Sequence, residues 1–517
     1  MTPPEPGGPG WPSPAPGAEP QSQDRPAWPP PPEAPPRPDD RPAWLRQPAA
    51  GPQGWSPAPP PDPPRRRVGP LAAALIPLLV VGLAVGGLVF ATRRDQPTPA
   101  AGAATAGAPT TQAPATRPPA TRAPAATATT PAVRAVQRAV AELRGLSFRR
   151  PVPVTVESPD KLARRLLRAL GEETNEGRLR RQGQAMRLLG ELPPGTDLPG
   201  LLRRVQAESV LGFYLPGQPP KKGGLYVRSN RGVDPYARII LAHELTHAVT
   251  DQRYDLTRAD RLAAQTARED ELAAYSALVE GDATFTMQRY LAERLTPAEQ
   301  ANAALAAATD RTPIRDAAPA VIRESMLFPY QEGLRFVSVL YQQGGWAAVN
   351  RAYRDPPTTT EQLLHPERYL RDRDQPQRVT VPDLGGRLGG GWRPGVELSF
   401  GELDARLLLQ GQLAVATAQT AAAGWDGGRV RTFQRGDKTA LVLRTVWDSG
   451  AEAGQFCGAM SGWATGRFGA ATRTGATLHW SGAGQHTTLL CRGPRVAWLS
   501  APDPPTLGRL TTALGGP

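Results

Sequence analysis

Two histidines and a glutamate in one short segment are the residues of this chain whose types and spacing best indicate catalytic chemistry. His243, Glu244 and His247 stand in the sequence His-Glu-Leu-Thr-His. Residues four apart lie on one face of an α-helix, so both imidazoles can bind one metal ion. Glu244 follows the first ligand directly and can take a proton from a water molecule beside that metal. The pattern predicts a Zn²⁺ site in which Glu244 is the general base.

Histidine is rare in this chain, which makes the motif informative. Only 5 of the 517 residues are histidine. The chance that this arrangement arises somewhere in such a chain is about two in a thousand. The alternative interpretation is an ordinary helix that carries two hydrogen-bonded histidines.

A catalytic zinc ion needs a third protein ligand, and its fourth position is left to water. Thr250 and Arg253 stand where a longer pattern, His-Glu-x-x-His-x-x-Gly-x-x-His, would have its glycine and third histidine. The third ligand is therefore expected to be a carboxylate. The downstream candidates are Glu269, Asp270, Glu271, Glu280 and Asp282.

Glu280 is the predicted third ligand among these carboxylates. It lies in the mostly apolar stretch 277–285, where a carboxylate without a partner would be costly. Gly281 beside it would allow close helix packing. The earlier three candidates start a helix, where the dipole favours carboxylates without any metal. Asp282 and Asp251 are expected either to orient the imidazoles or to be solvated helix charges.

Local patterns predict the elements that position this site. Asp234-Pro235 begins a helix that continues to about residue 252, and a second long helix covers 268–295. Segments 210–215 and 224–229 have the pattern of a β-hairpin. An extended peptide could add to the edge of that hairpin as a further strand.

The remainder of the globular part mixes helices with strands, which indicates an α+β protein. Further helices are expected at 132–143, 158–170, 397–422, 451–465 and 506–514, with two or three more between 297 and 353. Further strands are expected at 152–157, 429–434, 439–446, 477–480, 487–492 and 495–500. We expect a mostly helical domain at 131–375 and a smaller α+β unit at 376–517.

The first quarter of the chain has a different composition. Of the 60 prolines, 26 lie in residues 1–70, so residues 1–67 are expected to be a disordered tail. Residues 68–92 form a run of 25 residues without a charge, long enough to cross a bilayer as one helix. Residues 93–130 have the Ala/Thr/Pro composition of a linker.

These segments predict a single-pass membrane protein. Three arginines precede the uncharged run and two follow it, which places the N-terminus in the cytoplasm and the catalytic domain outside the cell. The tail repeats Asp-Arg-Pro-Ala-Trp at 24–28 and 40–44. The repeats indicate either low-complexity drift or a motif for a cytoplasmic partner that binds Pro/Trp segments.

Charge and cysteine content exclude two other classes of protein. The formal net charge is +13, but the basic residues are 56 Arg and 4 Lys in a chain rich in Ala, Pro and Gly. That balance indicates codon bias, and we predict no nucleic-acid partner. Cys457 and Cys491 allow at most one disulfide and exclude a Cys-rich zinc module. The sequence leaves open whether they pair.

The run His-Glu-Leu-Thr-His-Ala-Val-Thr-Asp at 243–251 resembles the active-site helix of thermolysin-like gluzincins. Over residues 200–430 the chain is similar to a family of uncharacterised bacterial, membrane-anchored neutral zinc metallopeptidases. The matching segments are Gly212-Phe-Tyr, Leu225-Tyr-Val, Asp251-Gln252, Val279-Glu-Gly-Asp-Ala283, Thr360-Glu-Gln-Leu-Leu-His-Pro-Glu-Arg-Tyr369 and Gly424-Trp-Asp-Gly427. The resemblance implies a zincin-like fold with Glu280 as third zinc ligand, and it implies no particular substrate.

His365 is the remaining histidine of this region. It precedes Pro366, which limits helix continuation and suggests a fixed turn. Zinc peptidases benefit from a donor aimed at the developing oxyanion, so His365 is predicted either to be that donor or to be a structural histidine. Tyr369 is a second candidate for the donor. His479 and His486 are predicted to be structural.

The predicted function is zinc-dependent hydrolysis of peptide bonds in a peptide or protein substrate, by a zinc-activated water with Glu244 as base. One alternative is a membrane-anchored binding or scaffold protein with a structural or relict zinc site. Another is a zinc amidase that acts on cell-wall peptides.

Overall fold

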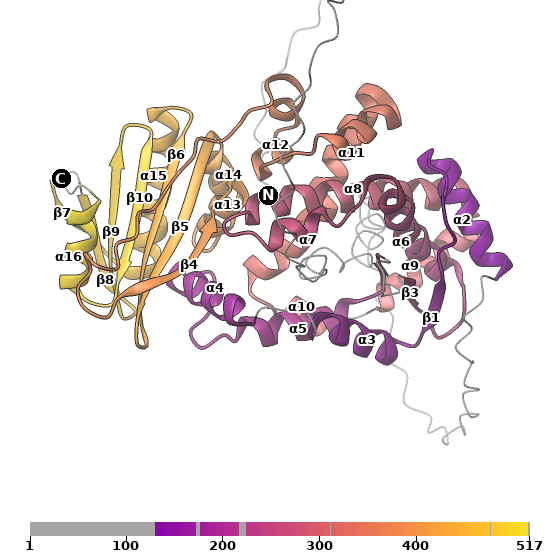
Figure 1. The fold of residues 1–517 in the computed structure, drawn as a ribbon, viewed down its shortest axis with the longest axis horizontal. Helices are drawn as coiled ribbons and strands as arrows, with labels where there is room; N and C mark the ends of the chain where they lie inside the picture. The colour runs from indigo at the N-terminus through magenta and orange to yellow at the C-terminus, as the bar shows by residue number, and fades with distance from the viewer. Residues whose placement is uncertain (1–129, 172–175, 217–223, 311, 476, 515–517) are drawn as a thin grey trace, which may run out of the picture. The chain divides into compact units, whose positions relative to one another are not determined.

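The computed structural model describes residues 130–517 except 172–175, 217–223, 311, 476 and 515–517 (Figure 1). The predicted tail with its proposed partner motif, the predicted transmembrane helix at 68–92 and nearly all of the linker lie outside these residues.

The predictions of a transmembrane helix and of a single-pass membrane location are not supported. Among the described residues, none of the helices combines the length and the apolar character needed to cross a bilayer. An uncharged run of 25 residues meets the length requirement, but hydropathy along a segment does not by itself establish a helix. This part of the predicted fold class is therefore corrected, whereas the α+β class itself agrees with the structure.

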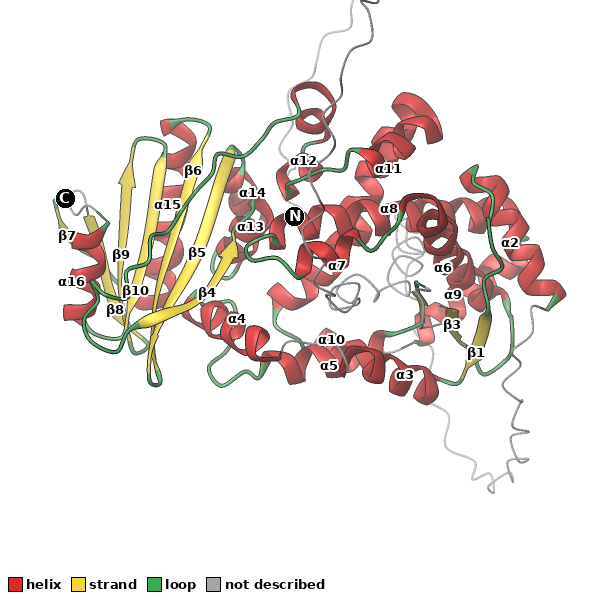
Figure 2. Ribbon diagram, in the orientation of Figure 1, coloured by secondary structure: helices red, strands yellow, loops and turns green. Residues whose placement is uncertain are grey.

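The part that carries the candidate site is mostly helical (Figure 2). Its helices are α2 (Pro131–Arg144), α3 (Pro159–Gly171), α4 (Glu176–Leu188), α5 (Leu198–Ser209), α6 (Pro235–Tyr254), α7 (Arg258–Ala263), α8 (Glu269–Arg294), α9 (Pro297–Thr309), α10 (Pro313–Asp316), α11 (Ala320–Arg354) and α12 (Thr360–Leu364), followed by a short π-helix, η3 (Arg368–Asp372). The two long helices predicted around the metal motif are α6 and α8.

A three-stranded sheet lies beside these helices. It consists of β1 (Val154–Glu157), β2 (Gly212–Leu215) and β3 (Gly224–Arg228) in the order β1-β3-β2. The predicted hairpin is confirmed, because β2 and β3 pair antiparallel, while β1 pairs parallel with β3. Strand β2 is therefore at an edge of the sheet, and it contacts α6.

Helix α8 packs against both α6 and α11, and two glycines allow the second contact. A Cβ atom on Gly281 would lie 2.2 Å from the carbonyl oxygen of Gly333, and one on Gly333 would lie 2.1 Å from the carbonyl oxygen of Ala277. The backbones of α8 and α11 thus touch directly. As expected from the sequence, Gly281 permits a close helix approach next to Glu280.

We expect Gly281→Ala to lower the free energy of unfolding by about 2–3 kcal/mol, because its methyl group must push two backbones apart. Urea unfolding measures this change. The matched control is Gly454→Ala, at an exposed helical position where a Cβ meets no atom within 4 Å. The free energy of unfolding of the control should rise by about 0.5–1 kcal/mol. Equal stability of Gly281→Ala and wild type would contradict the close contact.

The C-terminal part is built on a seven-stranded antiparallel sheet in the order β4-β5-β6-β10-β9-β8-β7. The strands are β4 (Arg393–Ser399), β5 (Trp425–Arg435), β6 (Lys438–Trp447), β7 (Thr472–Thr474), β8 (Thr477–Gly482), β9 (Gln485–Arg492) and β10 (Arg495–Ala501). The helices are α13 (Glu402–Gln410), α14 (Val415–Ala422), α15 (Gly450–Phe468) and α16 (Pro504–Ala513).

Both faces of this sheet are covered (Figure 1). Helices α13, α14 and α15 pack on the face that includes Leu441 and Leu443, whereas α16 packs on the face that includes Ala440 and Val442. The alternation of side chains along β6 separates these two cores. The strands and helices expected beyond residue 425 are confirmed.

The helix expected at 397–422 is wrong at its N-terminal end. Residues up to Ser399 belong to β4 and pair with β5, and two separate helices, α13 and α14, follow. The backbone N–H of Gly401 donates to the Asp404 carboxylate at 2.8 Å, which caps α13. The prediction missed the pairing of Ser399 in β4 with Arg429 in β5, because the two residues are 30 positions apart in the sequence.

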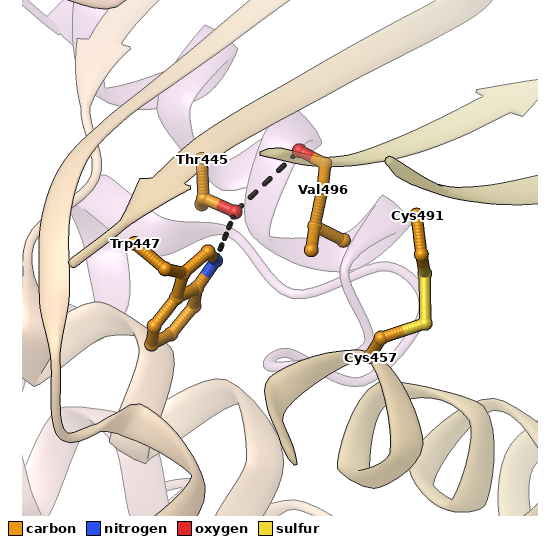
Figure 3. The surroundings of a disulfide bond; sticks show 5 residues. All are labelled: Thr445, Trp447, Cys457, Cys491 and Val496. Atoms are coloured by element: carbon orange, nitrogen blue, oxygen red, sulfur yellow. Dashed lines mark hydrogen bonds between the residues drawn. A yellow bond between two sulfur atoms is a disulfide. The ribbon is translucent and has the colours of Figure 1, made fainter. Parts of the chain in front are cut away.

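Cys457 and Cys491 form a disulfide (Figure 3). Cys457 lies on α15 and Cys491 on β9, with their Cα atoms 6.4 Å apart. Nearby, the indole N–H of Trp447 donates to the Thr445 hydroxyl at 3.0 Å. The disulfide ties the covering helix α15 to the interior strand β9, which answers the question that the sequence left open.

Candidate metal centre

Helix α6 carries the metal motif into the protein interior. The backbone N–H of Ala237 donates to the Asp234 carboxylate at 2.8 Å, and Pro235 occupies the first turn, so the helix begins where the sequence predicted. The middle of α6 is buried on all sides, from Ile239 to Asp251. The motif is therefore held rigidly and away from bulk water.

Three donor groups converge at this site, two from α6 and one from α8. The Nε2 atoms of His243 and His247 lie 3.0 Å apart. An Oε2 atom of Glu280 lies 3.1 Å from the first of these nitrogens and 3.5 Å from the second. The three side chains are at most 6% exposed. The structure thus brings together the three ligands predicted from the sequence.

This donor triangle has the dimensions of a metal site. A tetrahedral ion with bonds of about 2.0–2.1 Å separates its neighbouring donor atoms by about 3.3–3.4 Å. The three observed separations bracket that value. Imidazole nitrogens and a carboxylate oxygen are also suitable metal donors. The buried group of His243, His247 and Glu280 can therefore hold a metal ion.

The electrostatics of the triad favour a protonated His247 beside a charged Glu280. Burial raises the pKa of Glu280, but the charge of His247 and hydrogen bonds from both histidines outweigh this effect and hold that pKa at about 2. Burial lowers the pKa of His247, but the Glu280 carboxylate outweighs it and raises the pKa to about 9. A metal ion must displace this proton, so metal affinity should fall as the pH falls.

Glu244 lies next to the triad without belonging to it. Its side chain is 1% exposed, and burial raises its pKa to about 8 when no metal ion is bound. The backbone N–H of Tyr214, on the edge strand β2, donates to its carboxyl group. A Cβ on Gly212 would lie 3.0 Å from Cγ of Glu244. The edge strand therefore packs directly on the predicted general base.

The other candidate carboxylates for the third ligand have protein partners instead. Glu269 accepts from the backbone N–H of Ser399 at 2.9 Å. Asp270 accepts from the Thr360 hydroxyl at 2.6 Å, and Glu271 pairs with two arginines of its own region. These contacts leave Glu280 as the carboxylate that faces both histidines.

Asp282 and Asp251 are not hydrogen-bonded to the imidazoles. Asp282 forms a fully buried ion pair with Arg144 at 2.7 Å and accepts from the Tyr353 hydroxyl at 2.9 Å. Asp251 accepts from the Tyr214 hydroxyl at 2.9 Å. The two carboxylates hold α2, α11 and β2 against α6 and α8. They therefore position the helices that carry the ligands.

One aromatic residue at the site was missed in the sequence. The ring of Tyr330, on α11, stacks on His243 with centroids 6.0 Å apart. Tyr330 follows Pro329 in the middle of a long helix, and no local pattern links it to a histidine far upstream.

The structure does not bring His365 into the metal group. Its Nε2 atom lies 3.1 Å from a Glu402 carboxylate oxygen, and its Nδ1 atom lies 3.7 Å from Glu367. The Tyr369 hydroxyl donates to the backbone oxygen of Asp355. The predicted role of His365 as oxyanion donor gains no support from these contacts.

The last two histidines lie in the C-terminal sheet. His479 is 3.0 Å from the Thr488 hydroxyl, and His486 is 2.8 Å from the Ser481 hydroxyl. Both contacts are between neighbouring strands, which agrees with structural roles.

A small cavity of about 60 Å³ opens beside His247 and Glu280. Its wall is mainly apolar and aromatic, with Asp260 and Ser276 as additional polar groups. The other lining residues are Tyr214, Pro216, Leu256, Ala259, Tyr275 and Val279. The metal group is thus accessible to a small apolar group through this cavity.

Comparison with known proteins gives a match in the C-terminal part of the chain. Residues 394–511 match a family described as "Domain of unknown function (DUF8575)". This range covers the seven-stranded sheet and most of the helices on it. No curated protein and no solved structure matches the chain.

Proposed function

We propose that this protein is a zinc-dependent peptidase that hydrolyses peptide bonds. The observation that carries the proposal is the convergence of the His243, His247 and Glu280 donors at 3.0–3.5 Å, with the Glu244 carboxyl beside them. Two imidazoles and one carboxylate are a donor set of catalytic zinc. A zinc ion in this triangle supplies a Lewis acid that activates water and polarises a carbonyl group.

Glu244 moves the proton in the proposed reaction. Its carboxylate accepts a proton from the attacking water and then donates it to the nitrogen of the leaving amine. Burial raises the pKa of this carboxyl group, which makes Glu244 a stronger base than an exposed glutamate. The N–H of Tyr214 orients one carboxyl oxygen of Glu244.

The substrate is an extended peptide. Strand β2 is at a sheet edge next to the metal group, and a peptide can add to such an edge as a further strand. The cavity beside Glu280 then receives one side chain next to the cleaved bond. Its small volume and apolar wall favour a small or medium apolar side chain.

The competing proposal is a structural zinc site. The number of protein ligands at the metal group disfavours it. Structural zinc sites have four protein ligands. In the part of the chain that the structure describes, the metal group contains three His, Cys, Asp or Glu donors. A closed site would also have no use for a buried carboxyl such as Glu244 at its margin.

Metal analysis together with cleavage assays tests the proposal. The full chain should contain one zinc ion and cleave peptides of a random library, with a preference for a small apolar residue beside the cut. A chelator should abolish cleavage, and added zinc should restore it. Casein and purified cell wall, digested in parallel, separate a protein substrate from a cell-wall substrate. Cleavage that survives complete zinc removal would contradict the proposal.

A further inference from the structure

The C-terminal sheet carries a groove bordered by arginines. The groove has a volume of about 490 Å³, and Arg378, Arg444, Arg492 and Arg495 line it. Among the described residues, no aspartate or glutamate is part of its wall. The groove is therefore strongly positive.

Strand register explains how three of the arginines meet. Arg492 of β9 lies directly opposite Arg495 of β10, and Ala497 of β10 lies opposite both Arg444 of β6 and Leu490 of β9. Alternate residues of a strand point to the same side, so all three arginines project from one face. Leu490 packs with α16 on that same face.

The pairing of Arg492 with Arg495 lowers the stability of the sheet. Arg492 and Arg495 are exposed, and like charges directly opposite each other destabilise a strand pair. Elsewhere in the sheet, Arg429 and Arg431 lie within 4 Å of Glu397, which balances their charge. A cluster that lacks such a balance points to an external anion.

The groove arginines have few partners of their own. Arg444 donates to the backbone oxygen of Thr380 at 2.9 Å. Within the described residues, Arg378, Arg492 and Arg495 form no ion pair. Their guanidinium groups are free to bind carboxylates in a bidentate manner.

We propose that this groove binds an acidic peptide segment. Val446, Leu490, Ala497 and Leu514 provide apolar surface between the arginines, which suits the aliphatic parts of a peptide. No aromatic residue lines the groove within the described chain, although aromatic stacking is a main source of affinity for single-stranded nucleic acid. The proposal concerns a site outside the metal centre and does not depend on the proposed peptidase activity.

Fluorescence anisotropy with the full chain tests the proposal. The probe is a fluorescein-labelled octapeptide of alternating Glu and Val, and the comparison peptide has Gln in place of Glu. The acidic peptide should bind, more weakly at 200 mM than at 50 mM NaCl, and the Gln peptide should not. An eight-residue deoxythymidine strand and inorganic phosphate are used as competitors. Tighter binding of either competitor than of the acidic peptide would overturn the proposal.

A pair of charge-matched variants locates the binding site. The double variant Arg492→Gln/Arg495→Gln should weaken binding of the acidic peptide by about tenfold or more, because two charges that attract the peptide are lost. Its Tm should not fall, because the substitutions also remove a pair of like charges from the sheet. The control, Arg181→Gln with Arg473→Gln, removes two exposed arginines outside the groove and should change affinity by less than about twofold. Equal loss in both variants would mean unspecific charge attraction and would overturn the proposal.

Discussion

Glu244→Gln is expected to lower kcat for peptide cleavage by at least about a thousandfold while zinc remains bound. Glutamine keeps the shape of the side chain and can still accept the hydrogen bond from the Tyr214 N–H. It cannot take a proton from water, because an amide is not a base at neutral pH. Zinc content and single-turnover cleavage of a library-derived peptide measure the two effects separately.

A second buried glutamate provides the control for this variant. Glu361 is 2% exposed, and burial raises its pKa to about 9, but it lies outside the metal group. Glu361→Gln should therefore leave cleavage within about twofold of wild type. Full activity of Glu244→Gln would remove the general base from the proposed mechanism. Equal inactivity of both variants, with zinc retained, would show that loss of any buried carboxyl has this effect.

Glu280→Ala is expected to weaken zinc binding by more than about a hundredfold, with loss of activity as the consequence. Among the described residues, Glu280 is the carboxylate of the metal group, and the two histidines that remain after its removal make a weak site. Competition with a chromogenic zinc chelator measures the affinity. The zinc affinity of Glu280→Asp should lie between those of wild type and Glu280→Ala. The shorter aspartate side chain retracts the oxygen by about one carbon–carbon bond.

Two controls separate loss of a ligand from damage to α8. Glu271→Gln changes a buried carboxylate of the same helix that pairs with Arg258 and Arg268, so it should keep zinc affinity. Asp282→Asn weakens the buried contact with Arg144 and should lower stability more than zinc affinity. Wild-type affinity in Glu280→Ala would mean that another group completes the site.

Local spacing carried most of the information about the metal group. His243 and His247 lie four residues apart, and Asp234-Pro235 marks the start of their helix, so both features depend only on the geometry of one helix. Glu280 could be selected because a lone carboxylate in an apolar stretch requires a partner. The hairpin of β2 and β3 was readable for a similar reason, because its strands are close neighbours in the sequence.

Contacts between residues far apart in the sequence could not be predicted from the sequence. A single sequence gives no sign that Arg144 would neutralise Asp282, 138 positions away, or that Tyr330 would stack on His243. His365 has the residue type of an oxyanion donor, but its place beside Glu402 comes from the packing of α13. Residues 397–399 of β4 were predicted to be helical because the pairing of β4 with β5 is non-local.

The sequence by itself thus determined that His243 and His247 can share one metal ion, and it predicts Glu244 as the base beside them. It did so because 3.6 residues per turn bring positions four apart onto one face, whatever the rest of the fold does. Only the tertiary structure decided that Glu280 stands 3.1 Å from His243, that an edge strand covers Glu244, and that arginines gather on the C-terminal sheet. These contacts depend on the packing of segments far apart in the chain, and a local pattern of residue types does not contain that packing.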